Sequence, residues 1–273
     1  MVLHAGVLGS PIAHSLSPTL HRAGYAALGL AEWSYTAHEV DEVGLAPFVA
    51  GLDDGWRGLS LTMPLKVVAA QLAESVSATA RAARAINTLV RTPTGWAADN
   101  TDVHGITAAL RDVGVERPDR ATVIGSGATA RSAVLGLLAL GARHVTVAAR
   151  SPERAASLRD VADVELSVVP LTDWTRTGAE VVVSTLPGGA ANEAAAGHAD
   201  HDLSAVTVLD VVYAEWPTPL ARAAQEHGAQ VVCGIEMLVH QAARQFEIFT
   251  GEVAPVAAMQ AAGRAALGHS TDA

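Results

Sequence analysis

The chain has little of several things that define other classes of protein. Its only cysteine is Cys233, so it forms no internal disulfide, and lysine is nearly absent. No apolar run reaches membrane-spanning length, and no basic, apolar and small-residue segment of the signal-peptide type opens the chain. We therefore expect a cytoplasmic protein without a membrane partner.

Positive charge is also scarce, because 18 Lys and Arg stand against 28 Asp and Glu, for a net charge of −10. Proteins that hold a phosphate backbone gather Lys and Arg in clusters, and no such run occurs here, so nucleic acid is not an expected partner. Half of the 273 residues are apolar, which indicates a chain that folds compactly. This length is comfortable for two domains.

Short β-type runs alternate with helical ones along the whole chain, which favours a parallel α/β architecture. A polar stretch at 116–120 follows a helix expected over 101–114, so the seam between two α/β lobes is expected near 99–119. The strands are predicted at 3–8, 34–39, 57–61, 86–91, 121–124, 144–148, 165–169, 180–184, 206–211 and 229–232.

The second lobe opens with a glycine-rich turn between a strand and an apolar helix. The strand 121–124 runs into Gly125-Ser126-Gly127-Ala128-Thr129-Ala130, the strand–turn–helix context of a dinucleotide-binding fingerprint. Gly125 would permit the tight turn, Gly127 would let a pyrophosphate approach, and Ala130 would pack the helix. The alternative is a glycine-rich turn that binds nothing; strand, helix and spacing together favour nucleotide binding.

The next strand ends at Arg150, where an NAD-binding domain usually carries an acidic residue for the ribose hydroxyls. Ser151 is a candidate cap for a following helix with Pro152 at its first position, so Arg150 and Arg154 bracket a helix N-terminus that attracts anions. This charge pattern suits a 2′-phosphate, and the cofactor is interpreted as NADP. The alternative is two solvated surface arginines.

In the first lobe, the loop GSPIAHSLSP at 9–18 joins a strand to a helix expected over 18–30. Ser17 is the natural N-cap, with Pro18 at the first helical position, where its missing N–H costs nothing. Capping explains Ser17 but leaves Ser15 free for another role.

Lys66 is expected in the first turn of a helix that begins at Pro64. The helix dipole is positive at that end, so the same field would lower the pKa of the amine toward a value useful for proton transfer. The alternative is a lysine whose amine reaches solvent.

Asp102 supplies a potential partner for this lysine in the first turn of the next helix, capped by Asn100 or Thr101. A structural role for Asp102 is equally compatible, and a metal site from Asp99, Asp102 and His104 is disfavoured because no second His or Cys cluster completes it. Asn87 lies within an otherwise apolar strand, where a buried amide needs hydrogen-bond partners.

In these motifs the chain resembles the shikimate dehydrogenase family. The resemblance extends over almost the whole chain and rests on the order of nine segments rather than on one motif. The segments are GSPIAHSLSP, SLTMPLK, AINTL, DNTD, the glycine turn, ARSPERA, STLPGG, DVVYAEWPTPL and GIEMLVHQAARQFEIFTG.

The resemblance implies an α/β fold with an N-terminal substrate lobe, a Rossmann-type NADP lobe and C-terminal helices that return to the first lobe. The implied activity is the reversible reduction of 3-dehydroshikimate to shikimate with NADPH, in aromatic amino acid biosynthesis. The domains are expected at 1–102, completed by 237–273, and at 103–236. The chain is expected to act as a monomer or homodimer on a small-molecule substrate, with no metal.

The resemblance also implies residue roles. Lys66 and Asp102 match the catalytic pair, and Ser15 and Ser17 match the residues that hold the shikimate carboxylate. The other substrate-binding positions are Thr62, Asn87, Gln241 and Tyr213, and the cofactor-binding positions are Gly125, Gly127, Ala128, Arg150, Arg154, Thr185, Gly234 and Met237.

Three positions depart from the family's usual residues: Ser60 and Ala149 replace Asn, and Glu236 replaces Gly. Ala149 removes a contact to the adenosine end, so a preference for NADP rests on the two arginines. Two other readings stay open: an NAD-dependent quinate/shikimate dehydrogenase, and a non-catalytic NADP-binding regulator.

Overall fold

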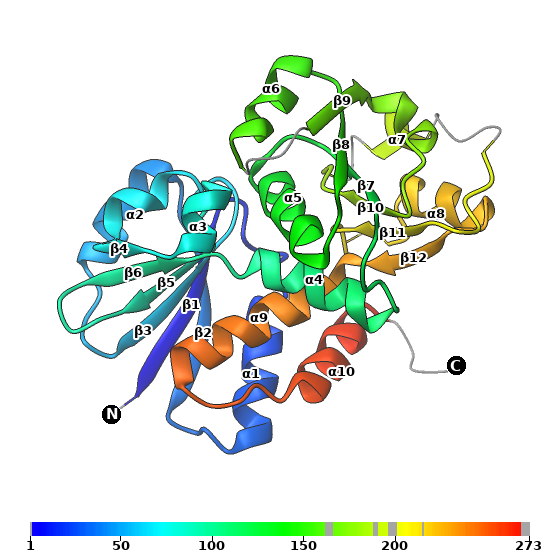
Figure 1. Cartoon of the computed structure of the whole chain (residues 1–273). Helices are drawn as coiled ribbons and strands as arrows, with labels where there is room; N and C mark the ends of the chain where they lie inside the picture. The colour runs from blue at the N-terminus through cyan, green and yellow to red at the C-terminus, as the bar shows by residue number, and fades with distance from the viewer. Residues whose placement is uncertain (1, 162–165, 188–190, 196–200, 215, 269–273) are drawn as a thin grey trace. The chain divides into compact units, whose positions relative to one another are not determined.

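The computed structural model describes residues 2–161, 166–187, 191–195, 201–214 and 216–268 (Figure 1). The chain divides into two compact units. The first comprises Met1–Gly105 and Leu238–Ala273, and the second comprises Ile106–Met237. No helix within the described ranges is both long and apolar enough to cross a membrane.

The first unit is built on a mixed sheet with the order β2-β1-β3-β5-β6-β4. The almost wholly buried strand β1 runs parallel to both β2 and β3, and its carboxyl end leads directly into the serine loop. The strands are β1 (Leu3–Gly9), β2 (Trp33–Glu39), β3 (Trp56–Leu61), β4 (Ser75–Val76), β5 (Thr88–Arg91) and β6 (Trp96–Asp99).

The alternation along the chain favoured a parallel α/β architecture, and this sheet is mixed, because β5 runs antiparallel to both β3 and β6. The segment 92–95 closes a tight hairpin, in which Thr92 N–H donates to the Gly95 carbonyl and Gly95 N–H donates to Thr92 Oγ1, both at 2.9 Å. The strand β6 was not predicted, since its apolar run is only three residues long and ends at an aspartate. The hairpin places Asp99 and the residues after it beside Asn87.

Helices from both ends of the chain cover this sheet. The C-terminal helices pack on α1, since a Cβ at Gly24 would lie 2.9 Å from Phe246 and 3.5 Å from Met259. Figure 1 shows α9 and α10 beside α1. The helices with residues in this unit are α1 (Ser17–Leu28), α2 (Glu42–Ala50), η1 (Val68–Leu72), α3 (Ala78–Ala83), the first turn of α4 (Asp102–Asp112), α9 (Gly234–Thr250) from Leu238 onward, and α10 (Val256–Ala266).

The second unit is a fully parallel sheet with the order β12-β11-β10-β7-β8-β9. Counted from β7, this is the doubly wound order of dinucleotide-binding domains, with its switch point between β7 and β10. The strands are β7 (Arg120–Ile124), β8 (His144–Ala149), β9 (Leu166–Pro170), β10 (Val181–Ser184), β11 (Thr207–Asp210) and β12 (Gln230–Cys233).

The helices of this unit surround a core of small and branched apolar side chains from α5, β7, β8 and β10. They are α5 (Ala128–Leu140), α6 (Pro152–Ala156), η2 (Ser157–Val161), η3 (Leu171–Arg176), α7 (Ala191–Ala195) and α8 (Pro219–Glu226). Each strand predicted from the sequence is present within about two residues of its expected bounds. Residue 165, the first of one predicted strand, lies outside the described residues.

Candidate active site

Lys66, the only lysine of the sequence, lies in a turn and not in the first turn of a helix. Residues 63–67 form turns after β3, and a short 3-10 helix begins only at Val68. The predicted helix from Pro64 was therefore wrong, because the chain does not become helical until two residues beyond the lysine. The effect of a helix dipole that was expected at the Lys66 amine therefore does not apply.

Lys66 instead forms an ion pair with Asp102, the first residue of α4. Lys66 Nζ donates to Asp102 Oδ2 at 2.6 Å, and the two side chains are only 16% and 5% exposed. Of the two predicted capping residues, Asn100 is the one whose side chain caps α4, since its Oδ1 accepts a hydrogen bond from the Val103 N–H at 3.3 Å. Asp102 is thus held at a helix N-terminus, where a carboxylate is favoured.

Asn87 connects this pair to the rest of the first unit. It is 1% exposed and lies just before β5 rather than inside it, which corrects the predicted strand start. The Thr101 N–H donates to Asn87 Oδ1 at 2.8 Å, and this fixes the orientation of the amide because a backbone N–H can only donate. Asn87 Nδ2 therefore donates to Asp102 Oδ1, at 2.8 Å.

Gln241 reaches the same cluster from α9. Its Oε1 lies 3.3 Å from Asn87 Nδ2 and 3.4 Å from Thr101 Oγ1, although 154 residues separate Gln241 from Asn87. Its Nε2 donates to the Leu238 carbonyl at 3.1 Å. An ammonium, a carboxylate and two amides thus converge, which is a donor and acceptor set suited to a ligand with several hydroxyl groups.

The serine loop follows the carboxyl end of β1 and differs in detail from the prediction. The N-cap of α1 is Leu16, which makes no side-chain cap, and the helix begins at Ser17 with Pro18 second. Ser17 is therefore not the N-cap. Its N–H donates weakly to Ser15 Oγ at 3.4 Å, so it is Ser15 that satisfies a free amide of the first turn.

Thr62 follows the carboxyl end of β3, the strand next to β1. Its N–H donates to the Leu8 carbonyl at 2.9 Å, which ties the two strand ends together. Because parallel strands end at the same edge of a sheet, the serine loop, Thr62 and Lys66 all lie along one edge of the first unit.

In the second unit, the glycine turn lies at the switch point of the sheet. Gly125 adopts a φ of 115°, which favours glycine, and a Cβ there would collide with Thr185 Oγ1. Thr185 Oγ1 donates to the Ile124 carbonyl at 2.9 Å. Gly127 is the N-cap of α5 and Ala128 its first residue, so the first amides of this helix lack a side-chain partner.

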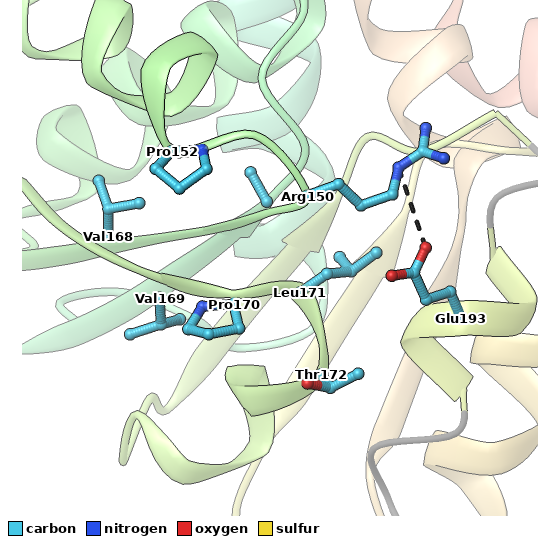
Figure 2. A pocket seen from close by; sticks show the side chains of 9 residues that line it. Arg150, Pro152, Val168, Val169, Pro170, Leu171, Thr172 and Glu193 are labelled. Carbon is cyan, nitrogen blue, oxygen red and sulfur yellow. Dashed lines mark ion pairs between the residues drawn. The ribbon is translucent and has the colours of Figure 1, made fainter.

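The carboxyl end of β8 lies beside this turn, since the Gly125 N–H donates to the Ala148 carbonyl at 2.9 Å. The same end of β8 borders a cavity of about 460 Å³ (Figure 2). Arg150 extends along it toward Glu193 of α7, with its Nε 3.9 Å from Glu193 Oε2, and both side chains are at least half exposed. The cavity is otherwise mostly apolar, lined by Ala149, Pro152, Val168, Val169, Pro170, Leu171 and Thr172.

The predicted cap beside this cavity is confirmed, since Ser151 Oγ accepts from Arg154 N–H at 3.4 Å and Pro152 occupies the first turn of α6. The arginine side chains at 150 and 154 are both exposed. Sequence reasoning did not single out Glu193, because a glutamate in a short alanine-rich segment carries no motif.

The three remaining predicted residues also belong to the second unit. A Cβ at Gly234 would collide with the Val211 carbonyl, so close backbone packing already requires this glycine. Met237 is 7% exposed and packs into the core of the unit, while Tyr213 is half-buried. Within the described residues, no group of three or more His, Cys, Asp or Glu side chains gathers as metal ligands do.

Comparison with known proteins places this geometry in one family. A shikimate dehydrogenase (NADP(+)) of Anaeromyxobacter dehalogenans is 38% identical over 266 residues, which cover 93% of this chain and 93% of that protein. The chain belongs to the shikimate dehydrogenase family. Models of the shikimate dehydrogenase substrate binding domain and of the shikimate 5′-dehydrogenase C-terminal domain match residues 7–89 and 234–262. A model of the coenzyme F420-dependent NADP oxidoreductases matches residues 120–213.

Solved structures of shikimate dehydrogenases superimpose on nearly the whole chain. The Mycobacterium tuberculosis enzyme is 44% identical with a TM-score of 0.87, and the match covers 97% of this chain and 99% of that one. The Thermus thermophilus enzyme in complex with NADP(H) and shikimate is 30% identical with a TM-score of 0.84, covering 97% and 100%.

Proposed function

We propose that this chain catalyses the reversible reduction of 3-dehydroshikimate to shikimate with NADPH, a step of aromatic amino acid biosynthesis. The observation that carries the proposal is the ion pair of Lys66 and Asp102, joined by Asn87 and Gln241 at one edge of the first unit. Shikimate carries a carboxylate and several hydroxyls, and this edge offers donors and acceptors for both.

Substrate binding is assigned to the first unit. Ser15 and Ser17 lie at the start of α1, and their hydroxyls would hold the carboxylate, since hydroxyl donors and a helix N-terminus both favour an anion. Thr62, Asn87 and Gln241 would hold the ring hydroxyls. Tyr213 would contribute from the second unit.

The chemical step is assigned to Lys66 and Asp102. NADPH, when bound, supplies the hydride that reduces the carbonyl carbon. The carbonyl oxygen gains negative charge in this step, and Lys66 Nζ stabilises that charge and delivers the proton that makes it a hydroxyl. The neutral amine regains a proton from solvent. Asp102 orients the amine, because one of its oxygens holds Lys66 while the other is held by Asn87.

Cofactor binding is assigned to the second unit. The amides at Gly127 and Ala128 would receive the pyrophosphate at the start of α5, and Gly125 and Thr185 shape the turn. The apolar cavity beside Arg150 suits an adenine ring, and Arg150 and Arg154 supply the positive charge that a 2′-phosphate requires. Gly234 and Met237 would lie near the nicotinamide.

The domain roles, the assembly and the location belong to the same proposal. We assign substrate binding and catalysis to 1–102 with 237–273, and NADP binding to 103–236. We propose a cytoplasmic monomer or homodimer, whose size light scattering after gel filtration would measure.

Initial rates of reduced-cofactor formation test the proposal directly. The purified protein would be given shikimate or quinate, each with NADP or NAD. Turnover mainly with shikimate and NADP supports the proposal. Turnover that favours quinate or NAD supports an NAD-dependent quinate/shikimate dehydrogenase, and no turnover in any mixture supports a non-catalytic regulator.

A further inference from the structure

A second glutamine of α9, Gln245, lies one helical turn beyond Gln241 and is completely buried. Residues four apart project from the same face of a helix, so both glutamines point toward the segment around Asn87. Gln245 Nε2 donates to the Asn87 carbonyl at 3.0 Å and to Thr88 Oγ1 at 2.9 Å, and its Oε1 accepts from Ser60 Oγ at 2.7 Å. Every polar atom of this buried amide is therefore used.

The orientation of the Gln245 amide follows from its partners. The Asn87 carbonyl can only accept, so the nitrogen of Gln245 must face it and the oxygen must face Ser60. Thr88 Oγ1 accepts from this nitrogen, so its own proton is free to point at Asn87 Oδ1, which lies 2.8 Å away. Gln245 therefore holds both the main chain of Asn87 and, through Thr88, its side chain.

Asn87 connects Gln245 and Thr88 to the reacting groups, Asp102 and Lys66. Its Nδ2 donates to Asp102 Oδ1 at 2.8 Å, and Asp102 Oδ2 accepts from Lys66 at 2.6 Å. The hydrogen bonds run in one direction, from Gln245 through Thr88 and Asn87 to the carboxylate. A buried chain of this kind strengthens its members and restricts their positions.

The other end of the chain is fixed in a packed interior. Ser60 accepts from the Tyr35 hydroxyl at 2.6 Å, and the Tyr35 ring stacks on His21 with 4.0 Å between centroids. Both rings are almost completely inaccessible to solvent. The anchor of Gln245 is thus a rigid part of the core rather than a surface group.

We propose that Gln245 is a positioning residue, which holds Asn87, and through it Asp102 and Lys66, in the geometry that proton delivery requires. The inference rests on the proposed function, because it assigns Gln245 a part in the same reaction. Misplacement of a reacting group by about 1 Å costs about 100-fold in rate, so a small relaxation at Asn87 should be visible in kcat.

Two matched pairs of variants test this. Thr88→Val removes only the hydroxyl that links Gln245 to the Asn87 side chain, whereas Thr88→Ser keeps it. Gln245→Met removes the hydrogen bonds of Gln245 to Asn87, Thr88 and Ser60. Ser60→Ala removes the Ser60 bonds to Gln245 and Tyr35 but keeps the bonds of Gln245 to Asn87 and Thr88. For each variant, kcat and KM for shikimate and for NADP would be measured on protein whose folded fraction is known from its melting curve.

We expect Thr88→Val and Gln245→Met to lower kcat about tenfold or more while KM for NADP stays unchanged. Thr88→Ser and Ser60→Ala should keep kcat within about threefold, even where Ser60→Ala lowers the melting temperature. The inference is overturned when Thr88→Val turns over like the unmodified enzyme, or when Ser60→Ala loses as much kcat as Gln245→Met.

Two results keep the test decisive. Should Gln245→Met fail to fold, the comparison of Thr88→Val with Thr88→Ser decides alone. Thr88→Val keeps the hydrogen bond from the Thr101 N–H to Asn87 Oδ1 and the bond from Gln245 to the Asn87 carbonyl. Absence of turnover in the unmodified protein would instead reject the proposed function. The two failures are therefore distinguishable.

Discussion

Lys66 Nζ lies 2.6 Å from Asp102 Oδ2, and the carboxylate side chain of the pair is 5% exposed. Breaking this pair leaves one largely buried charge without its counter-ion, which costs more free energy than the intact pair contributes to stability. A buried ion pair contributes little net stability, so the proposed proton transfer gives this pair a role that stability does not.

Replacing Lys66 by Ala should abolish most turnover and leave ligand binding intact. The proton donor is lost, so kcat should fall by about 100- to 10,000-fold, the usual contribution of a positioned acid or base. Calorimetric titration with NADP should give an affinity close to that of the unmodified protein, because Lys66 belongs to the other unit. A variant with normal turnover would remove Lys66 from the mechanism.

Replacing Ser15 or Ser17 by Ala should raise KM for shikimate about tenfold, since a hydrogen bond to a charged group is worth about 1.5–3 kcal/mol. KM for NADP should not change. Ser75→Ala, at an exposed serine of the same unit, is the control. Equal effects of the control and the loop variants would show that the loop does not hold the carboxylate.

Arg150→Ala should raise KM for NADP about tenfold and leave KM for NAD nearly unchanged, because only NADP carries the 2′-phosphate that a guanidinium holds. Arg159→Ala provides the matched control on the same unit, since its side chain is also exposed. A similar loss with both cofactors would mean that Arg150 contributes to folding and not to the recognition of the phosphate.

Glu193→Gln should act in the opposite direction. The Glu193 carboxylate faces Arg150 across the cavity of Figure 2 and would repel a phosphate bound there. Removing its charge should lower KM for NADP about twofold to threefold and leave KM for NAD unchanged, as expected for a partly exposed pair. A rise in KM for NADP would instead indicate that Glu193 helps to hold Arg150 in place.

His21 should make the protein less stable in acid. Burial lowers the pKa of His21 to about 3 from the ordinary value of 6.5, an effect that Gln245 partly opposes. Between these two pH values the unfolded chain binds a proton that the native chain does not, so the free energy of unfolding falls by about 1.4 kcal/mol per pH unit as pH drops from 6.5 toward 3.

His21→Phe keeps an aromatic ring against Tyr35 and should reduce this acid slope, as measured by urea unfolding at several pH values. His144→Phe, at an exposed histidine, should leave the slope as it is. An unchanged slope in His21→Phe would mean that other groups carry the acid dependence.

Local patterns predicted most of the fold. Strands such as β1 and β7 are short, mostly apolar segments that end at or just before a glycine, and this local pattern is visible in the sequence. The hairpin strand β6 was missed because it is short and ends in Asp99, and the helix at Lys66 was wrong because a proline and apolar neighbours also suit a turn.

The site was only partly predictable for a different reason. Sequence reasoning singled out Lys66, Asp102 and Asn87 separately, but the partners that fix their geometry come from far along the chain. Ser60 and Gln245 are 185 residues apart, and nothing local to either residue indicates that they meet. Such contacts follow from topology and become visible only with the three-dimensional structure.

The first unit is discontinuous, and this fixes the order in which the site is completed during synthesis. A ribosome that has made residues 1–105 has synthesised every strand of the first sheet, with Lys66 and Asp102, but neither glutamine of α9. All of Ile106–Met237 must emerge before Gln241 and Gln245 can reach Asn87. Translation that stops early therefore yields a chain with the reacting pair and Asn87 but without the two glutamine amides of α9.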